Sequence, residues 1–522
     1  MKQIAVLALA LAALSFHPEE RCSLTVELRD AATGRPLWGL LRAETAAGEP
    51  VRLDGLLSRG HGLDAKAPIS RWSVVPERAT LSLPRGKVVL QALHGLDRKA
   101  ARVELDLAGK ASETAAIALE RFHDAAASGY RNANTHLHLM KIPRDEADRY
   151  LCEIPRADGL ELVFLSYLER ADDDKTYISN RYTDDDLREL SKTGVLFGNG
   201  EEHRHNFEGY GEGYGHVMFL DLKKLVQPVS IGPGITKKGT DAPPLQPGID
   251  EARRQDATVV WCHNTFGLED IANLVTGRLH AMNIFDGGTH GSFRNTFYRY
   301  LNAALRVPFS TWTDWFIYDF SRVYARVPAL EKPKDFLDAL KAGRTYITNG
   351  PLFEFRVDGR EAGHTLRLAA PGKVRVTGRA IGRVDFRRAE LVRDGAVVAT
   401  SPSRPKDGVF EAALEAEVEV AAPGWLALRV PPPPVKDDPE LQEPVPANEL
   451  GQPLFGHTSP VYVGVEGVTP VPAKALRELL AELEGNRKIV EQKASFKDEA
   501  ERAQVLRVYD EGAAALRRLL GE

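Results

Sequence analysis

Histidine is the least evenly distributed residue type in this 522-residue sequence. The chain has 14 histidines, and an even spread would place about four of them between positions 136 and 290. That stretch holds eight, namely His136, His138, His203, His205, His216, His263, His280 and His290. Imidazole is a common metal ligand, and it can also act as a general acid or base near neutral pH. A catalytic or metal-binding site is therefore expected within this stretch.

Six residues form a series with the chemistry of metal ligands. His136 and His138 stand at i and i+2 in the run NTHLHL, so on a strand both side chains point to one face. Four further candidates follow, most of them at apparent strand ends: one carboxylate of the pair Glu201-Glu202, then His216, His263 and Asp314. Mixed histidine and carboxylate ligation suits zinc, manganese or iron, and a carboxylate can bridge two metals. We expect one or two divalent cations here; the alternative is a set of unrelated core and surface side chains.

The residues around these motifs predict an α/β region from 125 to 350. Apolar runs such as 160–165 and 258–262 alternate with helical segments. Thr183, followed by the acidic run 184–186, predicts the start of a helix that ends at Gly194. In parallel α/β barrels the C-terminal ends of the strands form the active-site face. We therefore expect the six candidate ligands to meet at that edge.

Four other segments flank this region. Period-two alternation predicts a β-sandwich at 22–121, and strand-like runs return at 351–466. Residues 471–522 predict two amphipathic helices, which we interpret as a docking or dimerisation element. Residues 1–16 have a positive start, an apolar core and small residues near a cut site, as in a signal peptide. The protein is therefore expected to be periplasmic or secreted.

The ligand series resembles the PHP (polymerase and histidinol phosphatase) metallohydrolase superfamily, most closely its carbaryl-hydrolase-like (CehA/McbA-type) branch. His136 and His138 match the HxH that opens the family's catalytic domain. Gly200-Glu201-Glu202 matches a G-x-E signature, which gives the ligand role to Glu202 rather than Glu201. Later family signatures are matched by Gly215-His216, by His263 and by Thr313-Asp314.

The resemblance extends over about 130 to 465, since 343–351 and 456–462 are similar to motifs of the family's C-terminal β domain. It implies an α/β fold with a PHP-like distorted (β/α) barrel. This barrel would be flanked by N-terminal and C-terminal β-sandwich domains and followed by the helical segment. It also implies a metal-dependent hydrolase that uses the six ligands given above.

Two departures from the family pattern bear on the number of metals. A T-D-H found in many members is replaced by 165–169, where Glu169 is a candidate substitute ligand. Asp314 is followed by Trp315 and not by a histidine. Three further histidines are left open. His203 and His205 are either ligands, substrate contacts or loop residues, and His290 lies in a Gly-rich loop that would reach a substrate or serve loop structure alone.

The reaction that these residues predict is metal-assisted hydrolysis, with Asp314 and His263 as catalytic candidates. A divalent cation lowers the pKa of bound water from ~15.7 toward ~7. The sequence shows no dense Arg/Lys cluster, which favours an ester or carbamate substrate. A metal-dependent phosphoesterase is one alternative. The other is a catalytically degenerate secreted binding protein that uses its β-sandwiches.

The composition of the chain excludes several classes of binding partner. The net charge of −5 comes without a long Lys/Arg run, which argues against nucleic acid. Three cysteines do not provide a disulfide framework. Beyond 1–16 no apolar run approaches membrane-spanning length. We expect a small-molecule substrate, no membrane span after signal removal, and either a monomer or a homo-oligomer.

Overall fold

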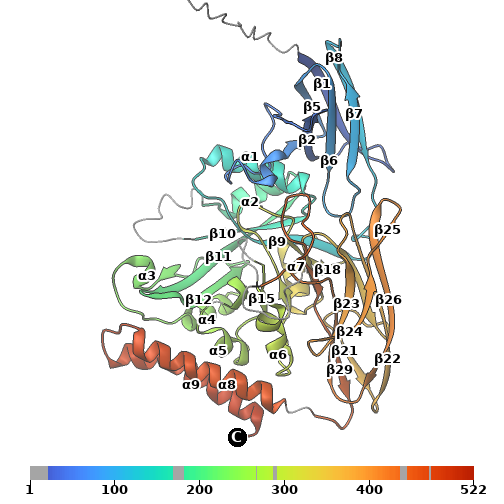
Figure 1. Cartoon of the computed structure of the whole chain (residues 1–522). Coiled ribbons are helices and arrows are strands. Elements are labelled where there is room, and N and C mark those ends of the chain that lie inside the picture. Colours follow the sequence, from blue (N-terminus) through green and yellow to red (C-terminus); the bar gives the residue numbers. More distant parts are fainter. Residues whose placement is uncertain (1–20, 169–180, 266, 286–290, 436–443, 470–471) are drawn as a thin grey trace, which may run out of the picture.

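The computed structural model describes residues 21–168, 181–265, 267–285, 291–435, 444–469 and 472–522. The expected signal peptide at 1–16 and the candidates Glu169 and His290 lie outside these residues. The described chain is a strand-rich α/β structure with a strongly curled central sheet (Figure 1). An N-terminal and a C-terminal β region flank this sheet, and two long helices end the chain.

Two sheets make up the N-terminal β region. The first has the order β5-β1-β8, and the second has the order β3-β2-β6-β7 with β4 beside β2. Their bounds are β1 (Arg21–Asp30), β2 (Gly39–Thr45), β3 (Pro50–Val51), β4 (Ser73–Val75), β5 (Arg78–Pro84), β6 (Lys87–Leu93), β7 (Ala101–Asp106) and β8 (Ser112–Leu119). Every second residue of β1 is buried, as its alternating sequence predicts. These side chains join those of β2 and β6 in one apolar core.

The central sheet has the strand order β9-β10-β11-β12-β14-β15-β16. The strands are β9 (Tyr130–His138), β10 (Leu162–Tyr167), β11 (Leu196–Phe207), β12 (Tyr210–Leu220), β14 (Thr258–Trp261), β15 (Ala281–Asn283) and β16 (Phe309–Ser310). The short strand β17 (Asp314–Trp315) then runs parallel to the end of β9. The segment 309–315 thus joins the two edges of the sheet, which is why the sheet curls around an interior.

The expected alternation of strands and helices is wrong at one place, because no helix separates β11 from β12. β11 and β12 form a long antiparallel hairpin, and β14 is antiparallel to β12. Phe207 pairs with Tyr210 across a two-residue loop, in which Gly209 has a φ of +75°. Such tight loops favour a residue that tolerates positive φ. β11 therefore continues past the end of β10, which pairs with it only as far as Glu201.

Short helices cover the sheet. They are α1 (Arg144–Ala157), α2 (Asp184–Ser191), α3 (Pro233–Thr236), α4 (Gln246–Arg254), α5 (Asp270–Val275), α6 (Arg299–Leu301) and α7 (Pro333–Lys341). The predicted start of α2 is confirmed: the Thr183 side chain accepts a hydrogen bond from the Asp186 amide, and the Asp186 carboxylate accepts one from the Thr183 amide. Apolar residues of α1 and α2 pack on the outer face of β10, where Val163 and Leu165 are buried.

The C-terminal β region continues the central sheet. β18 (Arg322–Arg326) and β19 (Thr345–Thr348) extend it beyond β9, and β19 pairs with β28. The strands of this layer are β21 (Thr365–Leu368), β23 (Arg388–Arg393), β24 (Ala396–Pro402), β27 (Gly424–Arg429), β28 (Gly456–Thr458) and β29 (Val461–Val465). A separate sheet consists of β20 (Leu352–Val357), β22 (Gly372–Gly382), β26 (Val409–Val420) and β25 (Arg404–Lys406).

The two C-terminal helices, α8 (Ala473–Lys493) and α9 (Glu499–Leu520), form an antiparallel pair against the central region (Figure 1). A Cβ at Gly512 would lie 2.9 Å from the Cα of Ala272, so glycine permits the close approach of α9 to α5. The tail docks on the central region of its own chain, and a part in dimerisation stays a prediction. Its apolar face is covered by the same chain, because Leu476 and Leu483 belong to the main core.

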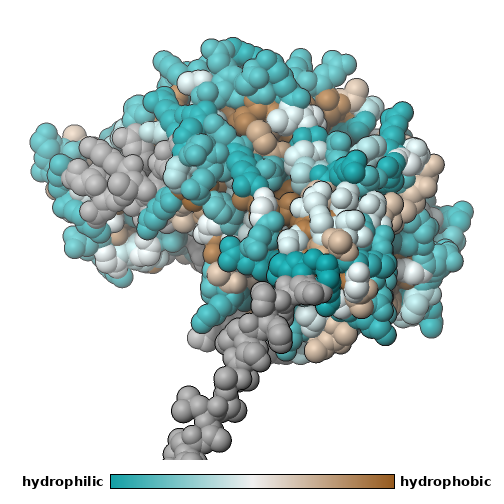
Figure 2. Space-filling view, turned by 90° about the horizontal axis from the view of Figure 1, so that it is seen from above, coloured by the Kyte–Doolittle hydropathy of each residue, from teal (hydrophilic) through white to brown (hydrophobic). Residues whose placement is uncertain are grey.

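The surface is mainly hydrophilic on the face that Figure 2 shows, where apolar residues form small patches. Among the described residues the exposed large hydrophobic side chains are Val397, Val398, Val468 and Leu519. None of the helices in the described part of the chain is both long and apolar enough to cross a membrane.

Truncation of a buried leucine tests the packing of the tail. Leu483 is 0% exposed, so Leu483→Ala should lower the free energy of unfolding by about 2–5 kcal/mol, through lost burial and a cavity. Leu519 on α9 is 48% exposed, and Leu519→Ala should change the free energy by less than about 0.5 kcal/mol. Urea unfolding of both variants is the measurement. Equal free energies of unfolding for the Leu483→Ala and Leu519→Ala variants would contradict the observed packing of α8.

Candidate metal centre

The structure brings the six candidate ligands together in two groups that share one residue. The first group contains His136, His138, Glu202 and Asp314, and the second contains Glu202, His216 and His263. Within each group, one ligand atom per residue lies within 4.8 Å of the others. Glu202 belongs to both groups and is 1% exposed.

The elements that position these residues explain their convergence. His136 and His138 lie at the end of β9, and His263 stands one residue beyond the end of β14. Glu202 and His216 lie within the long hairpin and not at strand ends, which corrects the sequence-based expectation. Glu202 nevertheless is the first residue of β11 beyond its pairing with β10. The hairpin thus places both residues level with the carboxyl ends of the neighbouring strands.

Glu202 directs its two carboxylate oxygens toward different partners. Its Oε2 lies 3.1 Å from Nε2 of His138. Its Oε1 lies 2.9 Å from Nδ1 of His216 and 3.1 Å from Nε2 of His263. Burial alone would raise the pKa of Glu202, but hydrogen bonds from the three histidines outweigh burial and hold its pKa well below the usual value. Glu202 is therefore an anion that faces both groups.

Asp314 completes the first group opposite Glu202. Its Oδ1 lies 3.4 Å from Nε2 of His136 and 3.6 Å from Nε2 of His138. The two Nε2 atoms are 2.7 Å apart. Burial lowers the pKa of His136 well below its usual value, and the nearby His138 adds to this effect. A neutral imidazole is the form that binds a metal.

The hydrogen-bond partners of His138 show that the first group suits a cation. Its Nδ1 faces the carbonyl oxygen of Ser166 at 2.8 Å, while its Nε2 faces the Glu202 carboxylate. A neutral imidazole has one N–H and satisfies only one of these two acceptors. A metal cation bound between Nε2 and Glu202 would satisfy both the carboxylate and the free ring nitrogen. A metal-binding histidine commonly donates its other N–H to a carbonyl or carboxylate.

His216 repeats this arrangement in the second group. Its Nε2 lies 2.8 Å from Oε2 of Glu212 and 2.9 Å from Oδ1 of Asn206, and its Nδ1 faces Glu202. The hydrogen bond to His216 lowers the pKa of Glu212 to about 2. Glu212 is thus a carboxylate that orients a candidate ligand, and the sequence interpretation missed it. Glu212 stands four residues before His216 in the sequence. On a regular strand this spacing would keep the two side chains apart, so the spacing alone gives no signal for the contact.

Backbone strain occurs at two of the six residues. His263 has a φ of +58° and Asp314 has a φ of +61°, both in the left-handed region. Residues other than glycine pay about 1–3 kcal/mol for such conformations, which cluster at functional sites. The surrounding contacts must therefore hold His263 and Asp314 in place.

His203 and His205 are not brought into either group. They alternate with Glu202 along β11, so their side chains lie on the opposite face of the strand. His203 hydrogen-bonds to Glu201 at 3.0 Å, and His205 lies 3.5 Å from Asp241. Glu201 also accepts a hydrogen bond from the amide of Val226. These residues support the outer face of the hairpin.

Single substitutions should separate the two groups. With zinc as the probe, we expect His136→Ala to lower the affinity of the first group and His263→Ala that of the second. Glu202→Gln should lower both affinities, because it removes the anion that the two groups share. Equilibrium dialysis followed by elemental analysis measures this stoichiometry. His364→Ala, at an exposed histidine, is the control. A His136→Ala protein that binds zinc like the unmodified chain would show that His136 is not a ligand.

Glu212 offers a second test within the same hairpin. Loss of an orienting carboxylate typically costs about 10–100-fold in metal affinity, so Glu212→Gln should weaken zinc binding at the second group by that factor. Glu208→Gln alters an exposed glutamate in the hairpin loop and should leave the affinity unchanged. Calorimetric titration distinguishes the two variants. If Asn206→Ala reduces the affinity and Glu212→Gln does not, the orienting group is Asn206.

Comparisons with known proteins give little beyond this geometry. Neither a family model nor a curated protein matches the chain. A solved structure that is similar in part is described as a two-domain protein containing a predicted PHP-like metal-dependent phosphoesterase from Bacteroides vulgatus. It is 14% identical with a TM-score of 0.34, over 58% of this chain and 92% of that chain. At this level the likeness does not establish a family for the present chain.

Proposed function

We propose that this protein is a metal-dependent hydrolase of the PHP type that holds two divalent cations, zinc, manganese or iron, on either side of Glu202. The observation that carries the proposal is the division of the buried Glu202 carboxylate between two histidine groups. A bridging carboxylate of this kind is the arrangement by which proteins hold two metals close together.

Each residue has a distinct part in this proposal. His136, His138 and Asp314 would hold one cation, His216 and His263 would hold the other, and Glu202 would bridge them. The cations would supply Lewis-acid polarisation and lower the pKa of water. Asp314 can also accept the proton that the water loses. The His263 side chain is 15% exposed whereas those of His136 and His138 are 0% exposed, so substrate would approach from the His263 side.

A cavity of about 430 Å³, which none of the six candidate ligands lines, has room for a small-molecule substrate. Its lining includes Ser166, whose carbonyl accepts the hydrogen bond from His138. A volume of this size is within the usual range for such ligands. The bond we propose is an ester, a carbamate or a related acyl bond.

A phosphoester is the second candidate, because the cavity is more basic than the sequence suggested. Arg181, Lys223 and Lys224 line it together with one acidic residue, Asp184. The sequence showed no dense basic cluster because Arg181 and the lysines are far apart along the chain. Cations in this position would attract the non-bridging oxygens of a phosphoester.

Export remains part of the proposal. It rests on the character of residues 1–16 and places the enzyme in the periplasm or outside the cell.

Hydrolysis of chromogenic probes tests the function. The purified chain, supplied with zinc, manganese or iron, should hydrolyse nitrophenyl acetate, a nitrophenyl carbamate or bis-nitrophenyl phosphate. Glu202→Gln should lower kcat/KM by at least about 100-fold, because it removes the carboxylate that both ligand groups share. A 100-fold loss corresponds to about 2.8 kcal/mol of transition-state stabilisation. His364→Ala should retain activity. If two metals bind and none of the probes is hydrolysed, the degenerate binding protein is the better interpretation.

A further inference from the structure

The segment that carries Asp314 is held by residues from outside the central sheet. Residues 314–320 comprise β17 and most of its connection to β18. The amide of Phe316 donates a hydrogen bond to the carbonyl of His138 at 2.9 Å. Arg59, in the N-terminal β region between β3 and β4, reaches this segment. Its guanidinium donates hydrogen bonds to the carbonyls of Ile317 and Asp319.

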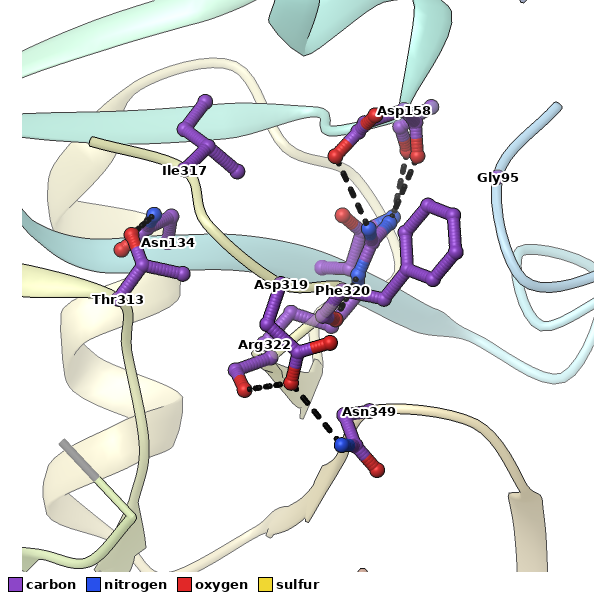
Figure 3. Close-up of polar contacts among 12 residues, drawn as sticks. Gly95, Asn134, Asp158, Thr313, Ile317, Asp319, Phe320, Arg322 and Asn349 are labelled. Carbon is purple, nitrogen blue, oxygen red and sulfur yellow. Dashed lines mark hydrogen bonds and ion pairs between the residues drawn. The ribbon is translucent and has the colours of Figure 1, made fainter. Parts of the chain in front are cut away.

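Arg59 is fixed at its other side by a buried carboxylate. Its Nε and Nη2 donate to the two oxygens of Asp158, at the end of α1, at 2.8 Å and 2.6 Å. Both side chains are 0% exposed. Asp158 also has Arg322 beside it, whose Nη1 donates to the Asp158 carbonyl at 2.9 Å (Figure 3). A bidentate pair of this type fixes direction as well as charge. The guanidinium therefore has one orientation from which it can reach the Ile317 carbonyl.

A second contact from the same N-terminal loop acts on Phe316. Gly62 has a φ of +84°, and a Cβ built there would lie 2.2 Å from two ring carbons of Phe316. Phe316 is 2% exposed, so its ring has little room to move away. Phe316 stands two residues after Asp314 and itself has a φ of +53°. The loop thus packs against the strained stretch of backbone next to the candidate ligand.

The C-terminal β region holds the far end of the segment. The Asp319 carboxylate accepts a hydrogen bond from Asn349 at 2.9 Å (Figure 3). It also accepts hydrogen bonds from Asn448 at 2.6 Å and from Ser321 at 2.7 Å. Asp319 is thereby anchored independently of Arg59. Nearer to Asp314, β9 pairs with β17, the Tyr150 hydroxyl accepts a hydrogen bond from the Ile317 amide at 2.7 Å, and the N-terminal loop adds its contacts to Phe316 and Ile317.

The geometry points to Arg59 and Gly62 as positioning residues: the N-terminal β region fixes the backbone that presents Asp314 to the first metal group. This inference rests on the proposed two-metal function and deepens it. It assigns the N-terminal β region a part in the metal site, although none of its residues lies in either ligand group. The second group, His216 and His263, does not depend on this segment and should be insensitive to changes at Arg59 or Gly62.

A pair of glycine substitutions tests the inference. Gly62→Ala and Gly55→Ala both put an L side chain at a φ near +85°, but at Gly55 a Cβ would meet nothing within 4 Å. Both variants therefore carry the same kind of local strain, and only Gly62→Ala pushes on Phe316. We expect Gly62→Ala to weaken cobalt(II) binding at the first group by about 10–100-fold, as for loss of an orienting partner. Gly55→Ala should bind like the unmodified chain.

A pair of arginine substitutions gives an independent test that keeps the buried charge. Arg59→Lys loses the fork of donors to Asp158 and Ile317. Arg98→Lys alters a comparably buried arginine, paired with Asp30, that does not contact 314–320. Both substitutions should lower the melting temperature. Arg59→Lys alone should weaken the first cobalt site and change its visible absorption, an effect that loss of stability by itself would not produce.

Cobalt titration monitored by visible absorption distinguishes the outcomes, with His136→Ala and His263→Ala assigning each equivalent to a group. Selective weakening of the first group in Gly62→Ala and Arg59→Lys supports the inference. Unchanged binding in both variants, or equal loss at both groups, overturns it while leaving the proposed function in place. If the unmodified chain binds no cobalt, the proposed function fails and the inference fails with it.

Discussion

The structure depends on one buried anion. Glu202 is ionised in the interior because three histidines hydrogen-bond to it, and it faces a different set of ligands with each oxygen. Such a charge is costly to bury unless positive charge compensates it. His138 and His216 each present a second ring nitrogen to another acceptor, so neither can compensate Glu202 as a neutral imidazole. Cations on both sides of Glu202 would supply the compensating charge, which is the physical basis of the proposed two-metal site.

The long hairpin is the element that makes this placement possible. A parallel strand that stopped level with β10 would end at Glu201 and would leave Glu202 in a loop. Continuing the strand and folding it back fixes Glu202 by hydrogen bonds of the β11–β12 pairing, in which it lies opposite Met218. Asp314 and His263, by contrast, stand on strained backbone outside long strands. The site thus combines a rigid central anion with peripheral ligands that depend on their surroundings.

Local patterns predicted much of this, and contacts between distant residues account for the rest. The Thr183 cap could be predicted because it depends on neighbouring residues, and the six candidate ligands because their motifs form a series that resembles a known family. The position of His203 and His205 on the outer face follows from period-two alternation with Glu202, a signal that the sequence contained. The antiparallel hairpin was missed because its Glu208-Gly209 loop is weak turn chemistry. The domain boundaries and the family remain predictions. Arg59 and Asp158 are 99 residues apart, and no local pattern links them.

The buried pair of Arg59 and Asp158 is better explained by the orientation that it gives the guanidinium than by a gain in stability. Apolar side chains of similar volume often stabilise a core as well as a buried ion pair does, because desolvation offsets much of the attraction. Apolar side chains, however, would leave the Ile317 carbonyl without the hydrogen bond that the Arg59 guanidinium donates to it. The segment 314–320 must hold Asp314 at a positive φ, a conformation that relaxes unless several contacts oppose it. Hydrogen bonds of fixed direction from Arg59 on one side and to Asp319 on the other provide that opposition, so the flanking β regions hold the backbone that the ligand group requires.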